Sequence, residues 1–130
     1  MGFELTGAEE LIKQLERMGM RVESVGDAAL TAAAQPIAEE AKSRVHPISG
    51  DLTEAIRAGK PRTGRNGRKI TIGVHRKDWH KDDYYPAYVE FGHGGPRPAP
   101  PHPYIRPALE TKRDEANAII VNTIKAALPH

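Results

Sequence analysis

The chain has 130 residues, a formal net charge of +2 and no cysteine. This length fits one domain with a modest core, and an aromatic content of 5% means that aliphatic residues and alanine must fill that core. The lack of cysteine excludes a disulfide framework and a cysteine-based zinc site, and the small net charge does not mark a dedicated nucleic-acid-binding protein.

Helical patterns dominate the first half of the chain. After a short alternating stretch at Phe3-Glu4-Leu5, Thr6 and Glu9 have the spacing of a capping box, which predicts a helix that ends near Val25. Gly26-Asp27 predicts a break or bend before a second helical pattern, whose apolar stripe is Leu30, Ala33, Ile37, Ala41 and Val45. Pro36 lies within that stripe, so we expect a kink or a restart near Gln35. Ser49-Gly50-Asp51 then predicts the cap of a short third helix that carries Leu52 and Ile56.

Residues 57–69, "RAGKPRTGRNGRK", are rich in basic residues and glycine and contain no acidic residue. This composition predicts a mobile basic loop, which fits the tip of a long hairpin. One interpretation is a solvated tip that docks onto an acidic partner surface, and the other is a loop that neutralises phosphates. The candidate contacts with DNA or a partner are Arg57, Lys60, Arg62, Arg65, Arg68 and Lys69.

Two segments in the second half alternate like strands. Lys69 to His75 places three aliphatic side chains on one face, and Tyr85 to Gly92 places Ala87, Val89 and Phe91 on one face. A final helix is predicted from about Pro107 to Leu128. The order of these elements predicts one α+β domain over residues 1–130. Its small antiparallel sheet of about three to four strands has one face covered by two long helices and a short helix.

A proline-rich arm connects the last predicted strand to the last helix, over residues 92–107. Twelve residues from Pro96 to Pro107 in polyproline-II geometry would span ~37 Å at ~3.1 Å each. Composition leaves open whether the arm reaches neighbouring subunits or folds back on its own domain, and whether the uncovered sheet face is solvated or a contact surface. The candidate interface residues are Trp79, Tyr88, Glu90, Arg97, Pro98, Pro101, Pro103, Tyr104, Ile105 and Arg106.

No pattern of catalytic residues or cofactor ligands stands out. The serines lack a nucleophile-elbow pattern, and the glycines of "GHGG" have no P-loop lysine beside them. The spacing of His75 and His80 fits no standard zinc motif, so we expect no native metal site among the nearby candidates, which are Asp78, Asp82, Asp83, Glu90, His93 and His102. We therefore expect a protein that is not an enzyme and needs no cofactor. With no apolar stretch of membrane-spanning length and no signal peptide, a soluble intracellular protein is expected.

Several short motifs, taken in order, resemble one family. "YPAYVEFG" at residues 85–92 is similar to a "YAxYVEFG" signature, and "HPYIRPALE" is similar to the "PxPFLRPAL" signature that follows it. "HPISGDL" resembles the "AP(x)xTGxL" segment after the second helix, and "FELTG" resembles the start of the family. The family is the tail-component, or head–tail joining, family of long-tailed bacteriophages and prophages.

The resemblance implies a structural protein of the phage neck. Such a protein would form a ring, possibly a hexamer, that completes or joins the tail and leaves a channel for DNA. Its partners would be other copies of itself, the head connector or stopper, and the tail-terminator or tail-tube proteins, with no membrane involved. It would be present in the host cytoplasm during assembly and in the neck or tail of the virion afterwards. The alternative is a small basic nucleic-acid-binding protein or endoribonuclease toxin that uses the 57–69 loop.

Overall fold

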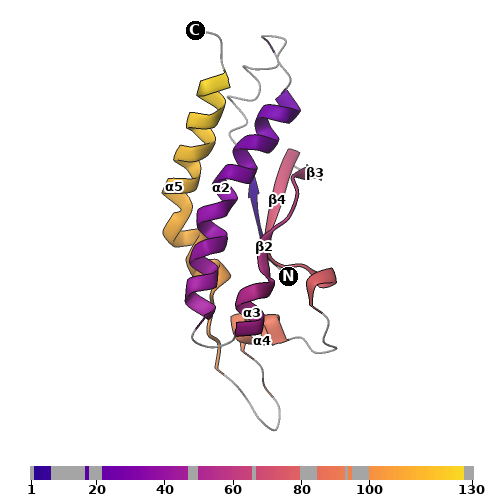
Figure 1. Cartoon of the computed structure of the whole chain (residues 1–130), viewed down its shortest axis with the longest axis vertical. Helices are drawn as coiled ribbons and strands as arrows, with labels where there is room; N and C mark the ends of the chain where they lie inside the picture. Colours follow the sequence, from indigo (N-terminus) through magenta and orange to yellow (C-terminus); the bar gives the residue numbers. More distant parts are fainter. Residues whose placement is uncertain are drawn as a thin grey trace.

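In the computed structural model the protein is a helical layer packed against one side of a small sheet (Figure 1). The structure describes residues 2–6, 17, 22–46, 50–65, 67–79, 85–92, 94 and 100–127. The elements are β1 (Gly2–Thr6), α2 (Val22–Val45), α3 (Gly50–Ala55), β2 (Ile56–Ala58), β3 (Arg62–Gly64), β4 (Gly67–Val74), a 3-10 turn (Arg76–Asp78), α4 (Tyr85–Phe91) and α5 (Ile105–Ala127). The predicted α+β class is confirmed.

Strand β4 is the centre of an antiparallel sheet of four strands. β1 pairs with one edge of β4, with Phe3 opposite Ile72 and Leu5 opposite Ile70. β2 and β3 pair one after the other with the opposite edge, with Ala58 opposite Ile72 and Arg62 opposite Lys69. Between these two pairs, residues 59–61 face only residues 70 and 71, so the strand bulges by one residue. Pro61 has no N–H to donate to the ladder, and the bulge accommodates it.

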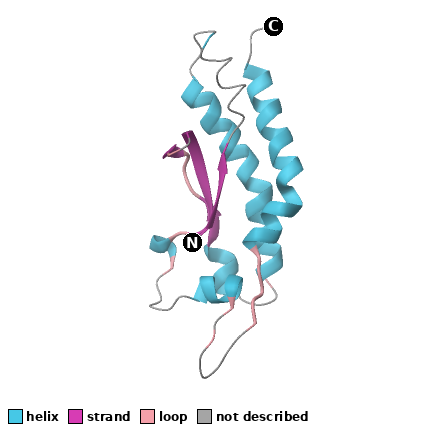
Figure 2. Ribbon diagram, turned by 180° about the vertical axis from the view of Figure 1, so that it is seen from behind, coloured by secondary structure: helices cyan, strands magenta, loops and turns pink. Residues whose placement is uncertain are grey.

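The two long helices lie side by side and run in opposite directions, and the sheet packs against one side of the pair (Figures 1 and 2). All five residues of the predicted α2 stripe, from Leu30 to Val45, are at most 1% exposed. Alanines on this face let α5 approach closely, because the distance between helix axes depends on the side chains at the contact. From β4, Ile70, Ile72 and Val74 point into the same core. The core is therefore aliphatic, as the composition requires.

Helix α2 runs through both positions where a helix end or kink was predicted. Gly26-Asp27 does not break it, and it continues past Pro36 to Val45. Pro36 leaves the carbonyl of Ala32 without its helical donor. Ala32 is exposed, so water can bind that carbonyl, and the run of alanines at residues 32–34 favours the helix. The helix predicted before Gly26 lies largely outside the described residues.

The segment Tyr85–Phe91 is the helix α4, and the prediction of a strand there was wrong. Pro86 is tolerated because it lies in the first turn, where a backbone N–H has no helical partner. The buried residues are Pro86, Val89 and Glu90, which follow helical spacing and not alternation. Val89 does pack in the core, but Phe91 is 61% exposed and does not tie the sheet to the helices. The short helix α3 was predicted correctly around Leu52, although Ile56 belongs to β2.

Candidate functional site

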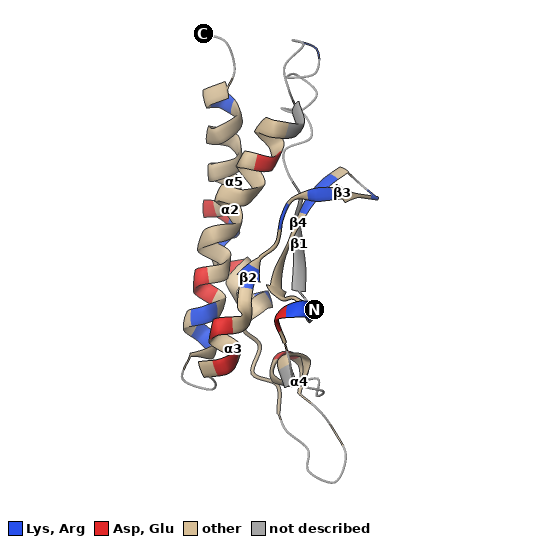
Figure 3. Cartoon of the chain, turned by 45° about the vertical axis from the view of Figure 1, so that its right-hand side comes forward, with Lys and Arg blue, Asp and Glu red and all other residues tan. Residues whose placement is uncertain are grey.

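The basic segment 57–69 forms much of the β2–β3 edge and the turn into β4. β3 and β4 make a tight hairpin in which Gly64 lies opposite Gly67, and Gly67 has a φ of 114°, a conformation that favours glycine. The hairpin projects away from the helical layer and carries Lys and Arg along its length (Figure 3). The segment predicted as a basic loop that fits the tip of a long hairpin thus contains β2, β3 and the turn into β4. We use the name basic hairpin for residues 59–69.

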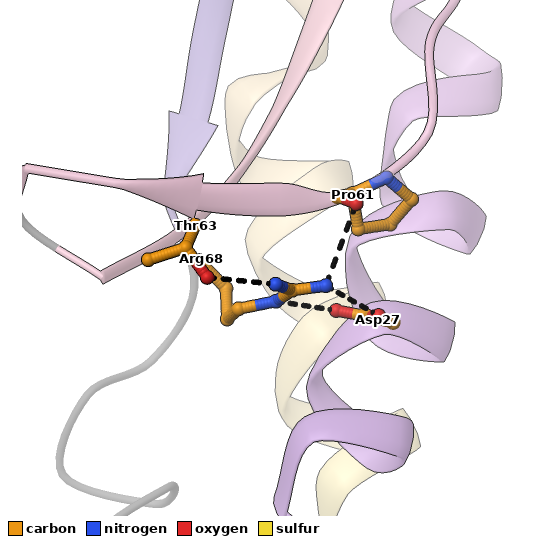
Figure 4. A network of polar contacts seen from close by, with 4 residues as sticks. All are labelled: Asp27, Pro61, Thr63 and Arg68. Atoms are coloured by element: carbon orange, nitrogen blue, oxygen red, sulfur yellow. Dashed lines mark hydrogen bonds and ion pairs between the residues drawn. The ribbon is translucent and has the colours of Figure 1, made fainter.

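Arg68 is not a free cation on this hairpin but a clamp between the hairpin and α2 (Figure 4). Its Nε donates to Asp27 Oδ1 at 2.9 Å and its Nη2 to Asp27 Oδ2 at 2.6 Å. Its Nη1 donates to Thr63 Oγ1 at 3.0 Å across the hairpin. Both charged side chains are about one quarter to one third exposed (23% and 31%), so the pair is only partly screened by water. The clamp fixes how the basic hairpin is oriented relative to α2.

Arg57 also has an acidic partner within the chain. It forms an ion pair with Asp78, and this pairing lowers the pKa of the Asp78 carboxyl below its usual value. The backbone carbonyl of Arg57 lies 3.2 Å from His75 Nε2. Burial, with a smaller effect of the Arg57 charge, lowers the pKa of His75. Arg57 and Arg68 therefore contribute to holding the fold together, and their assignment as candidate DNA or partner contacts stays a prediction.

The remaining basic side chains of the hairpin are directed outward. Lys60, Arg62 and Arg65 are exposed. Within the part of the chain that the structure describes, none of these three side chains forms an ion pair. Lys69 lies directly opposite Arg62 and is half-buried. Its methylenes run across Gly64, where an added Cβ would be 2.7 Å from Lys69 Cδ.

A second polar network attaches the end of the proline-rich arm to α4. Glu90 is 3% exposed, and its Oε1 accepts from the backbone N–H of Tyr104 at 3.1 Å and from that of Ile105 at 2.7 Å. These donors lie at the start of α5, where backbone N–H groups lack helical partners and a negative charge is favoured. The backbone N–H of His102 donates to the carbonyl of Val89 at 2.7 Å. The carboxylate of Glu90 therefore acts as the cap of α5.

Tyr104 completes this network from within the core. It is 0% exposed, and its hydroxyl donates to the backbone carbonyl of Pro86 at 2.9 Å. Burial raises the pKa of Tyr104, and the nearby Glu90 charge raises it further. Ile105 is likewise 0% exposed. Glu90, Tyr104 and Ile105 thus join α4 to α5 inside one chain, and their assignment as interface residues stays a prediction.

The other candidate interface residues fall into three groups. Pro101, Pro103 and Arg106 are exposed beside α4, as an interface requires. Trp79 is half-buried and packs against the core, and its assignment as an interface residue stays a prediction. Arg97, Pro98 and the side chain of Tyr88 lie outside what the structure describes. Phe91 is the exposed large apolar residue that sequence reasoning missed, because the segment was read as a strand whose apolar face was buried.

The chain can also be compared with known proteins. The profile of one family, described as "Bacteriophage HK97-gp10, putative tail-component", matches residues 9–92. The chain belongs to the HK97-gp10-like family. Searches of curated proteins and of solved structures gave no significant match.

Membership of the HK97-gp10-like family agrees with the resemblance found in the sequence motifs, and it makes the chain a bacteriophage tail component. As a member of this family, the protein would contact other structural proteins of the phage and reside in the virion tail. The matched range contains the basic hairpin, the Arg68–Asp27 clamp and α4, and it ends where the proline-rich arm begins. The family description names a structural component and no reaction.

The described residues were also considered as a metal site and as membrane-spanning helices. Among the described residues, no three His, Cys, Asp or Glu side chains are grouped so that they could hold a metal ion. Of the residues weighed for a metal site, His80, Asp82, Asp83 and His93 lie outside the described part. Among the described helices, none is long and apolar enough to cross a membrane.

Proposed function

We propose that this member of the HK97-gp10-like family is a structural protein of the phage or prophage neck. It assembles, as a ring of several copies, at the junction between head and tail, and it completes or joins the tail. The observation that carries the proposal is the family match over residues 9–92, which includes most of the described elements. Its partners would be the head connector or stopper on one side and the tail-terminator or tail-tube proteins on the other.

One surface is suited to contacts between copies or with neighbouring proteins. At one end of the molecule, Phe91 is exposed on α4, and Pro100, Pro101 and Pro103 are exposed on the adjoining part of the arm. The His102–Val89 and Glu90 hydrogen bonds hold this stretch beside α4 before any partner binds. Such preorganisation lowers the entropy lost on association, and exposed apolar groups supply contact area. We propose Phe91, Pro101, Pro103 and Arg106 as interface residues.

The first test is the mass of the native protein, measured by native mass spectrometry over a range of concentrations. A closed oligomer, such as a hexamer of six times 14.3 kDa, would support the ring. Because assembly can require a partner, the second test removes the gene from the phage or prophage that encodes it. We expect full heads and separate tails that fail to join, as seen by electron microscopy. Normal joined particles from the deletion would refute the proposed function.

The surface at Phe91 is tested by Phe91→Ser. Since the side chain is 61% exposed, we expect little change in the free energy of unfolding but weaker association or weaker complementation of the deletion. The matched control is Asn122→Ser, an exposed position near the opposite end of α5. Equal complementation by both variants would remove Phe91 from the interface.

A further inference from the structure

The basic hairpin, residues 59–69, has an unusual composition for a protein-binding element. It contains no acidic residue, no aromatic residue and no aliphatic side chain larger than that of Pro61. Arginine is common in protein–protein interfaces, but these interfaces also depend on a few buried aromatic or apolar anchors, which this hairpin lacks. Interfaces with nucleic acid are more polar and much more positively charged. The composition of this hairpin therefore fits a phosphate-bearing ligand better than a protein surface.

The structure separates the basic residues of this region by role. Arg57 and Arg68 are neutralised by Asp78 and Asp27, which belong to the same chain. Lys60, Arg62 and Arg65 are exposed, and none of them forms an ion pair with another described residue. The Arg68 clamp orients the hairpin, so these three cations are presented from a fixed support. A preoriented support lowers the entropy cost of binding.

The hairpin also places like charges close together. Arg62 and Lys69 lie directly opposite each other on β3 and β4. Like charges at such positions destabilise a strand pair, typically by a few tenths of a kcal/mol to ~1 kcal/mol. Arg68 points to α2, so the alternation of side chains along β4 directs Lys69 to the sheet face away from the helices. A polyanion bound on that face would lie beside Arg62.

From these observations we infer that the basic hairpin binds the phosphate backbone of nucleic acid, without regard to base sequence. Lys60, Arg62 and Arg65 would each pair with a phosphate, and Lys69 would add to the local positive potential. With no aromatic side chain on the hairpin, base stacking is not available, and binding depends on phosphate contacts alone. The inference goes beyond the proposed function, because it applies to a single copy of the chain. A ring would present several hairpins at once and raise the avidity.

The test is fluorescence anisotropy with a labelled DNA duplex of random sequence, over a series of salt concentrations. Three phosphate contacts predict a slope of about −2.7 in log K against log salt, or a loss of about 40-fold in affinity from about 50 mM to about 200 mM salt. The double variant Arg62→Gln/Arg65→Gln should reduce the slope to about −0.9, so its loss over the same range is only about 3- to 4-fold. A labelled single strand and an RNA hairpin distinguish the sources of the phosphate backbone.

A matched control removes two positive charges elsewhere. Arg113→Gln/Lys125→Gln changes two exposed residues of α5 and alters the net charge equally. We expect it to keep the wild-type slope. If both double variants lost the same DNA affinity, the attraction would be diffuse and the assignment to the hairpin would be wrong. The assignment would also be wrong if the hairpin variant bound DNA as the wild type does. If the hairpin variant bound DNA normally but lost its native oligomer or its joining activity, the ligand would be an acidic protein surface. Failure of DNA binding with intact joining activity would refute this inference while leaving the proposed function standing.

Discussion

The carboxylate of Glu90 offers the sharpest test of how the arm is attached. Glu90→Ala removes the carboxylate oxygen that accepts from the backbone N–H groups of Tyr104 and Ile105, both of which are buried. Each buried donor left without a partner costs ~1–3 kcal/mol, so the loss of both hydrogen bonds should lower the free energy of unfolding by ~2–6 kcal/mol. That is a large part of the ~5–15 kcal/mol that keeps an ordinary domain folded.

Glu90→Gln separates the hydrogen bonds from the charge. The amide oxygen can still accept both N–H groups, while the negative charge at the start of α5 is lost. Since a charge at a helix N-terminus contributes ~0.3–2 kcal/mol, we expect this variant to lose ~1 kcal/mol, clearly less than Glu90→Ala.

The assay is urea unfolding followed by circular dichroism, at a protein concentration where the result does not change on dilution. Glu54→Ala, an exposed glutamate on α3, is the control and should change the free energy of unfolding by less than ~0.5 kcal/mol. If Glu90→Ala were as stable as Glu54→Ala, the network between α4 and α5 would not hold the fold, and the role of Glu90 would have to be sought between copies.

Three more predictions concern the other polar groups. Asp27→Asn, Arg68→Gln and the double variant should give a coupling energy of ~1–2 kcal/mol in a double-mutant cycle, and a value near zero would mean that strand pairing alone holds the hairpin. Burial raises the pKa of Tyr104, so above pH ~10 the hydroxyl loses its proton in the unfolded chain before it does in the folded one. The free energy of unfolding should therefore fall as the pH rises, by up to ~1.4 kcal/mol per pH unit relative to Tyr104→Phe. Parallel pH curves for those two proteins would contradict the buried position of Tyr104. The pKa of His75 is lowered, so as the pH falls below ~6.5 the imidazole takes up a proton in the unfolded chain first, and the free energy of unfolding should decrease. In His75→Gln, the midpoint of urea unfolding should depend less on pH between neutral and mildly acidic conditions. An unchanged slope in His75→Gln would show that His75 titrates as it does in the unfolded chain.

The failures of sequence reasoning have specific causes. In Tyr85–Phe91, alternation and helical spacing both fit a short run of seven residues, and only burial of Pro86, Val89 and Glu90 together identifies the helix. Asp27 looked like part of a helix break next to Gly26. A signal for its real role was an acidic residue near the start of α2 in a protein whose 57–69 segment contains only basic charges.

The sequence by itself determined the α+β class, the stripe of α2, the central strand and the family, because these depend on periodicity and on short motifs that act within their own segments. It also indicated an extended basic element and a proline-rich connection before α5. Only the tertiary structure decided which charged residues are available to a partner. Arg57, Arg68 and Glu90 look like their exposed neighbours in the sequence, but each has its partner at least 14 positions away along the chain. Whether a charged side chain is paired depends on which residues lie beside it in the folded chain, and local sequence patterns do not predict these neighbours.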